Sequence, residues 1–174
     1  ATGLPLGIGG GAIIDNTLDT TDVVSSELRI LAPSGVSLDT QVSQLSARTV
    51  RGFSTVDIAN TGALTINGPG ISSRGGISVV ASSPLTVDAP VVNTLRTDII
   101  LTAIFDGIGV DDNLIIRDSI TSTATGFVTN GSIILTGQNI LISVPASPVN
   151  ITTAIRGNIT FNTDDGIAAG TDVV

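Results

Sequence analysis

The sequence predicts an all-β fold, a parallel β-helix of about six coils with three short strands in each coil. Three observations predict it. Short strings alternate between apolar and polar residues, such strings recur at intervals of 21 to 34 residues, and paired strings keep a near-constant offset. Imperfect repetition with this period is typical of stacked repeats, in which each repeat contacts only its neighbours.

The leading string of each repeat has a period of two, which is typical of a strand and not of a helix. Its first apolar residues follow one another after 28, 21, 22, 34 and 26 residues: Leu28, Val56, Ile77, Ile99, Ile133 and Ile159. We expect these residues to stack on one wall of the β-helix, with neighbouring coils about 4.8 Å apart.

A second string follows the first at a steady distance. It begins eight residues later at Val36, Leu64 and Leu85, seven later at Ile140, and fifteen later at Leu114, where the sequence has an insertion. A third, weaker β-like stretch follows in four repeats, at residues 44–47, 91–95, 119–122 and 149–153. Three strands in each turn are typical of a parallel β-helix.

Glycine precedes the first apolar residue by two positions at Gly75, Gly131 and Gly157. We expect these glycines at a corner of the coil, where the backbone must be free of a Cβ atom. The alternative fold is an antiparallel β-sandwich of the pilin type, which shares the strand lengths and the alternation. The steady offset between paired strings favours the β-helix.

Composition excludes several classes of function. Seven Arg against 15 Asp and Glu give the 174-residue chain a net charge of −8, which disfavours nucleic acid as a partner. The chain has no His, Cys or Lys, so the usual bases for a Ser nucleophile and the usual zinc ligands are missing. No run of uninterrupted apolar residues approaches the roughly eighteen that a membrane-spanning helix needs. We predict that the chain is not an enzyme and holds no cofactor.

One acidic cluster keeps two other interpretations open. Asp106, Asp111, Asp112 and Asp118 lie in the insertion, close to Arg117, and carbohydrate-active β-helix enzymes use such carboxylates. Residues 105–114 also resemble a Gly-rich calcium turn, which predicts a weak calcium site at Asp106, Asp111 and Asp112. Because Asp is a common turn residue, we prefer the interpretation of solvated turn carboxylates.

The same four-residue string, Thr-Asp-Val-Val, occurs at residues 21–24 and at residues 171–174. We expect residues 1–25, which are rich in Gly, to form a linker or a segment that docks on a neighbouring subunit, and residues 26–174 to form the repeat domain. An uncapped β-helix presents strand edges to other chains, so we expect both ends to stack on further coils. The residues expected to take part are Thr21, Asp22, Val23, Val24, Thr171, Asp172, Val173 and Val174.

Two strings carry a family resemblance, Ser-Thr-Val-Asp-Ile-Ala-Asn at residues 54–60 and Gly-Gly-Ile-Ser-Val-Val-Ala at residues 75–81. They resemble the repeats of filamentous-haemagglutinin-type surface proteins of bacteria, over residues 26 to 170. The resemblance implies a right-handed parallel β-helix that serves as an adhesin or as the shaft of a fibre. We therefore expect an extracellular, cell-surface structural protein whose partners are its own copies or adjoining repeats, end to end, and a host or neighbouring cell surface.

Overall fold

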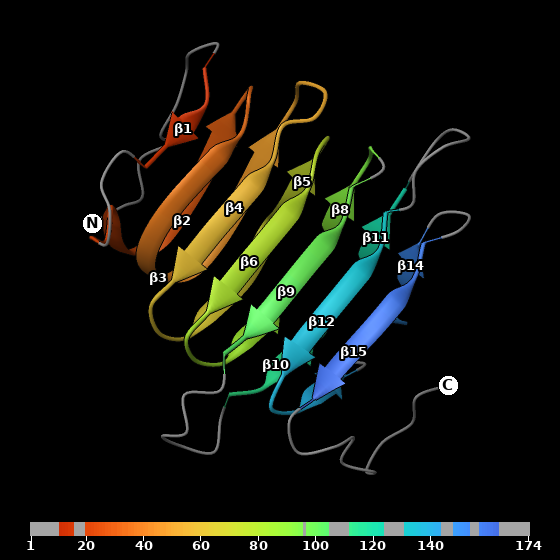
Figure 1. Cartoon of the computed structure of the whole chain (residues 1–174). Coiled ribbons are helices and arrows are strands. Elements are labelled where there is room, and N and C mark those ends of the chain that lie inside the picture. Colours follow the sequence, from red (N-terminus) through yellow and green to blue (C-terminus); the bar gives the residue numbers. More distant parts are fainter. Residues whose placement is uncertain are drawn as a thin grey trace.

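The computed structural model describes residues 11–15, 20–95, 97–104, 112–123, 131–143, 148–153 and 157–163. Its fifteen strands belong to one sheet, every pairing between them is parallel, and the described residues contain no helix. In Figure 1 the front strands run to the lower left and the strands behind them return to the upper right, while the coils advance to the lower right. The fold is therefore a right-handed parallel β-helix, as predicted, and not an antiparallel sandwich.

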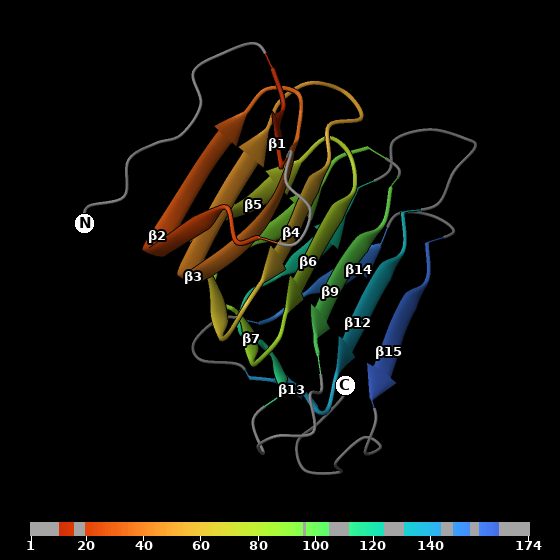
Figure 2. The ribbon, with the colours of Figure 1, turned by 60° about the vertical axis from the view of Figure 1, so that its left-hand side comes forward.

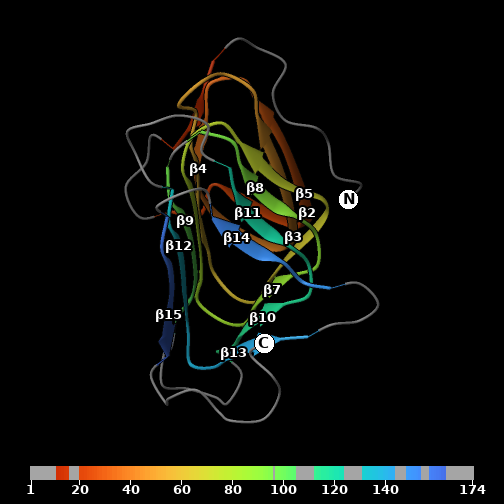
Figure 3. The ribbon, with the colours of Figure 1, turned by 90° about the vertical axis from the view of Figure 1, so that its right-hand side faces the viewer.

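Three walls make up each coil, and Figure 3 shows them surrounding the interior. The first wall holds the longest row of strands: β1 (Ile13–Ile14), the start of β3 (Val36–Thr49), β4 (Val56–Asn60), β6 (Ile77–Ala81), β9 (Ile99–Ala103), β12 (Ile133–Gly137) and β15 (Ile159–Thr163). The described residues thus complete six coils and begin a seventh, in agreement with the predicted number of about six.

In the later coils, the other two walls are built from strands of only three residues. The second wall holds β2 (Val23–Ala32), the middle of β3, the start of β5 (Leu64–Ser73), β7 (Leu85–Val87), β10 (Leu114–Ile116) and β13 (Ile140–Ile142). The third wall holds the ends of β2, β3 and β5, then β8 (Val91–Asn93), β11 (Ile120–Ser122) and β14 (Ile151–Thr153).

The sequence analysis assigned the strings of the first repeat to the wrong walls of the coil. Leu28 pairs with Leu45 on the second wall and does not head the first wall, whereas Val36 pairs with Val56 on the first wall. The cause lies in β2, a strand of 10 residues that continues around a corner, and in β3, a strand of 14 residues that continues around two corners. Because neither strand contains Gly, Pro or Asn, the sequence does not mark where one wall ends and the next begins.

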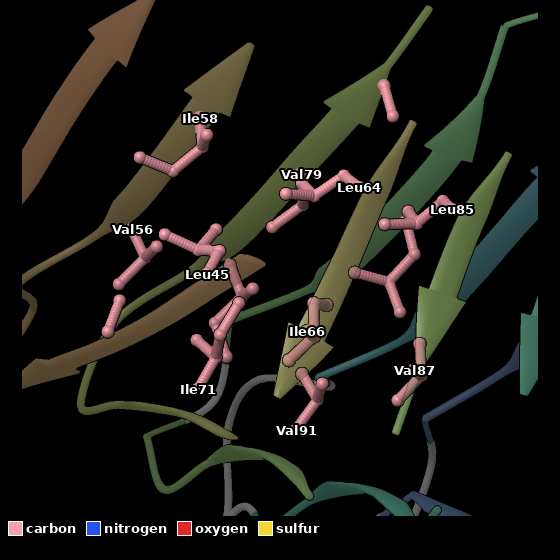
Figure 4. Packing of buried hydrophobic residues seen from close by; sticks show 14 of the residues in the cluster. Leu45, Val56, Ile58, Leu64, Ile66, Ile71, Val79, Leu85, Val87 and Val91 are labelled. Atoms are coloured by element: carbon pink, nitrogen blue, oxygen red, sulfur yellow. The ribbon is translucent and has the colours of Figure 1, made fainter. Parts of the chain in front are cut away.

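The core consists of aliphatic columns that run along the axis of the β-helix. On the first wall, the second inward position is occupied by Leu38, Ile58, Val79, Leu101 and Leu135, all of them buried. Figure 4 shows side chains from the different walls pointing toward one another in the interior. Burial of like residues on like residues explains why the sequence needs so few kinds of apolar side chain.

The corner glycines are required by close packing between coils. A Cβ atom on Gly75 would lie 2.4 Å from the carbonyl oxygen of Ser54, and one on Gly157 would lie 2.4 Å from that of Gly131. A Cβ atom on Gly131 would lie 2.9 Å from the carbonyl oxygen of Thr97. The prediction for these three glycines is confirmed, and the physical reason is contact with backbone atoms of the preceding coil.

Strand pairing extends N-terminal of residue 26. Ile13 and Ile14 pair with the start of β3, and Val23 and Val24 pair with its middle. Figure 2 shows β1 and β2 at one end of the stack and β13 and β15 at the other end. The predicted domain boundary at residue 26, with a linker or docking segment before it, stays a prediction.

Candidate self-association surface

The aliphatic columns are open at the C-terminal end of the described β-helix. Ile159 and Phe161 of β15 are 39% and 41% exposed, whereas their partners Ile133 and Leu135 in β12 are fully buried. The same change is seen on the other walls, where Ile140, Ile142 and Ile151 are only half-buried. The last described coil therefore exposes, at least in part, apolar residues whose equivalents in the interior coils are buried.

Strand edges accompany this apolar surface. Among the described residues, β13, β14 and β15 each have a hydrogen-bonded neighbour on one side only. At the opposite end, β1 and the ten residues of β2 pair only with β3. An edge with a neighbour on one side offers its remaining N–H and C=O groups to a further strand. Both ends of the stack are thus templates for parallel pairing.

The structure places the N-terminal half of the predicted self-association set at the edge formed by β2. Asp22 is tied to β3, because its N–H donates to the carbonyl oxygen of Asp39 (2.7 Å) and its carboxylate accepts the N–H of Asp39 (3.0 Å). Val23 packs partly against the core and Val24 is exposed. Thr21 lines a shallow groove of about 300 Å³ together with Asp39 and residues of the next coils. Thr171, Asp172, Val173 and Val174 lie outside the described residues.

The acidic cluster is only partly described. Asp106 and Asp111 lie outside the described residues, and Asp112 is buried beside β10, where its carbonyl oxygen accepts the N–H of Gln138 (2.9 Å). Asp118 lies at the other end of β10 and its carboxylate accepts the N–H of Ser119 (2.6 Å). In the described ranges, no three His, Cys, Asp or Glu side chains gather as metal ligands would. The calcium site and the carbohydrate-active alternative therefore stay predictions.

Arg117, which the sequence places beside this cluster, makes its ion pair elsewhere. Its guanidinium lies 3.3 Å from the carboxylate of Asp88 in the preceding coil, and both side chains are exposed. An exposed pair of this kind contributes little to stability, about 0 to 1 kcal/mol. Arg117 thus links two coils at the surface.

An internal column of small polar side chains was missed by the sequence reasoning. It occupies the last inward position of the third wall, where paired strands bring together Ser73, Asn93, Ser122 and Thr153. Thr49 extends the column, since its hydroxyl is hydrogen-bonded to that of Ser73 (3.0 Å). The Ser73 hydroxyl donates to the carbonyl oxygen of Ser54 (2.6 Å) and accepts the N–H of Gly75 (3.0 Å). Thr49, Asn93 and Thr153 also bind the corner that follows their own strand, donating to the carbonyl oxygens of Ser54, Thr97 and Gly157 respectively. A small polar residue two positions after the inward aliphatic residue of each third string is the signal that reveals the column.

Two serines of this column should respond differently to loss of the hydroxyl. Ser73→Ala leaves the buried N–H of Gly75 without its partner, so we expect the free energy of unfolding to fall by about 1 to 3 kcal/mol. The buried Ser122 hydroxyl has no hydrogen-bond partner among the described residues, so Ser122→Ala should be neutral or stabilising. Urea denaturation followed by circular dichroism measures both. Equal destabilisation by the two variants would contradict this account of the column.

The fold defines the chain as a parallel β-helix protein, and in its described part a strand edge with a neighbour on one side only lies at each end. Comparison with protein-family models, with curated proteins and with solved structures gives no match. In the part of the chain that the structure describes, there is no helix with the length and apolar character needed to cross a membrane. The resemblance to filamentous-haemagglutinin-type repeats stays an expectation from the sequence.

Proposed function

We propose that this chain is a structural, adhesive rod, a shaft segment or subunit of an extracellular bacterial cell-surface fibre that stacks end to end with further β-helical coils. The observation that carries the proposal is the exposure of Ile159 and Phe161 at the last described coil, in columns that are fully buried in the coils before it. A further coil in the same register would bury them and complete the hydrogen bonding of β15. The occupant is a second copy or an adjoining repeat.

Head-to-tail stacking follows from the geometry of the two ends. The open surfaces of the first and last coils are different, so contact between them is heterologous and does not close into a dimer. The strands of a parallel β-helix also keep one direction throughout the stack, which only a head-to-tail arrangement preserves. Repetition of this contact produces a filament.

The distribution of charge favours the same arrangement. Residues 1–87 carry four Arg and six acidic residues, a net charge of −2, whereas residues 88–174 carry three Arg and nine acidic residues, a net charge of −6. Tail-to-tail contact brings together the two more acidic halves. Head-to-tail contact brings the more acidic half of one copy to the less acidic half of the next and therefore reduces repulsion.

The test places charge on the inward or on the outward side of the last strand. Ile159→Lys with Phe161→Lys should abolish concentration-dependent assembly of the full chain, because two ammonium groups would have to be buried between coils. Thr160→Lys with Asn162→Lys adds the same charge to the same strand on its outward, exposed side and should leave assembly intact. Sedimentation velocity and electron microscopy provide the measurement.

Both double variants alter exposed side chains, so circular dichroism should show both to be folded. A wild-type chain that stays monomeric at hundreds of micromolar would overturn the proposal. Equal assembly of the two double variants would overturn it as well, because the inward side of β15 would then have no role.

A further inference from the structure

Phe53 is held in an unusual position in the connection between β3 and β4. Its φ is +60°, in the left-handed region that side-chain-bearing residues rarely adopt, and it is 81% exposed. The turn is fixed on both sides of the ring. Ser54 donates to the carbonyl oxygen of Arg51 through its N–H (3.4 Å) and its hydroxyl (2.6 Å), and the N–H of Arg51 donates to the carbonyl oxygen of Pro33 (2.9 Å). Phe53 thus combines a strained backbone conformation with an exposed aromatic ring.

The ring belongs to a larger patch at the same corner of the β-helix. We define the corner patch by three exposed apolar residues and three exposed arginines: Leu31, Val50, Phe53, Arg48, Arg51 and Arg74. In the register of the sheet, Arg48 lies between Leu31 and Ser72, and the guanidinium of Arg74 donates to the carbonyl oxygen of Val50 (3.4 Å). Coil stacking therefore gathers residues that lie far apart in the sequence. The β3–β4 connection arches over the upper edge of the molecule in Figure 1.

The corner patch carries positive charge in a chain whose net charge is −8. The two ion pairs of the described residues involve Arg29 and Arg117, so Arg48, Arg51 and Arg74 have no carboxylate partner there. The connections at residues 50–55 and 74–76 contain no Asp or Glu. Among the described residues, no carboxylate oxygen lies within 4.0 Å of a nitrogen of these three guanidinium groups. The patch is locally basic and at the same time apolar.

We propose that the corner patch docks the protein on an anionic lipid surface. Guanidinium groups bind phosphate in a bidentate manner and are attracted to an anionic leaflet. Phe53 has no hydroxyl or N–H group, and with Leu31 and Val50 beside it the ring suits the boundary between headgroups and acyl chains. A binding surface for an anion alone would not require three exposed apolar side chains. The contact is peripheral, and its strength grows when several copies in a rod bind together.

The test uses vesicles of phosphatidylglycerol and phosphatidylcholine, with pure phosphatidylcholine vesicles for comparison. Wild-type chain should co-sediment with the anionic vesicles and much less with the neutral ones. Phe53→Gly removes the ring and also relieves the positive φ, so the variant should be at least as stable as the wild type while its affinity for anionic vesicles falls about tenfold. Arg51→Gln and Arg74→Gln should each reduce that affinity about fivefold.

Two controls keep the result interpretable. Ile104→Ser removes an apolar side chain that lies outside the patch and is about as exposed as Leu31 and Val50, so it should leave vesicle binding unchanged. The variant with Ile159→Lys and Phe161→Lys should bind vesicles as a monomer, which separates docking from assembly. Absence of binding by the wild type, or unchanged binding by folded Phe53→Gly, would overturn the proposal. Binding of a soluble acidic polysaccharide without binding of vesicles would overturn it in favour of a glycan ligand.

Discussion

Gly75→Ala should lower the free energy of unfolding by about 3 kcal/mol, because the new methyl group meets backbone and not a movable side chain. Its Cβ atom would lie 2.4 Å from the carbonyl oxygen of Ser54, 2.6 Å from the Ser54 carbonyl carbon and 2.7 Å from that of Phe53. Relief of these contacts requires two successive coils to separate at the corner. Urea denaturation of the full chain, followed by far-ultraviolet circular dichroism, measures the change.

The neighbouring glycine provides a matched control for this prediction. A Cβ atom on Gly76 would make ordinary van der Waals contacts, the nearest at 3.7 Å from the carbonyl oxygen of Asp98. Gly76→Ala should therefore change the free energy of unfolding by less than about 1 kcal/mol. The change should be stabilising, because alanine reduces the conformational entropy of the unfolded chain. A Gly75→Ala variant as stable as Gly76→Ala would show that the coils do not pack as closely as the structure indicates.

Leu101→Ala should lower the free energy of unfolding by about 2 to 5 kcal/mol, because it removes a buried side chain from the middle of an aliphatic column. Leu101 is fully buried between Val79 and Leu135, which belong to the coils on either side of it. Neither neighbour can fill the cavity without leaving its own place in the stack. The measurement is again urea denaturation, at a protein concentration where the chain is monomeric.

The end of the same column provides the comparison for Leu101. Phe161 pairs in register with Leu135 and is 41% exposed, so Phe161→Ala should lower the unfolding free energy of the monomer by about 1 kcal/mol or less. Under conditions of assembly, the effect of Phe161→Ala should grow because a further coil then covers this residue. If the two substitutions lowered the free energy of unfolding of the monomer equally, Phe161 could not lie at an exposed end of the column.

The candidate surfaces were predictable from sequence only in part. A β-helix with uncapped ends implies adhesive edges, and that expectation needed no coordinates. The sequence did not indicate that Ile159 and Phe161 would be the exposed members of their columns, because their strings look like those of interior coils. The corner patch was equally hidden, since Arg48 and Arg74 come together only when the length of one coil is known.

Alternation, repeat spacing and the steady offset between paired strings predicted a parallel β-helix of about six coils, because period-two strings flanked by turn residues specify both the strand and its inward side. The structure then excluded the antiparallel sandwich, since all strand pairs among the described residues are parallel. The sequence patterns also determined which glycines stand at corners. Only the tertiary structure decided the phase of the first coils, where β2 and β3 pass a corner without interruption, and the contents of the polar column. The physical reason is that stacking depends on which coil lies above which, and that register is set by contacts between residues about twenty positions apart.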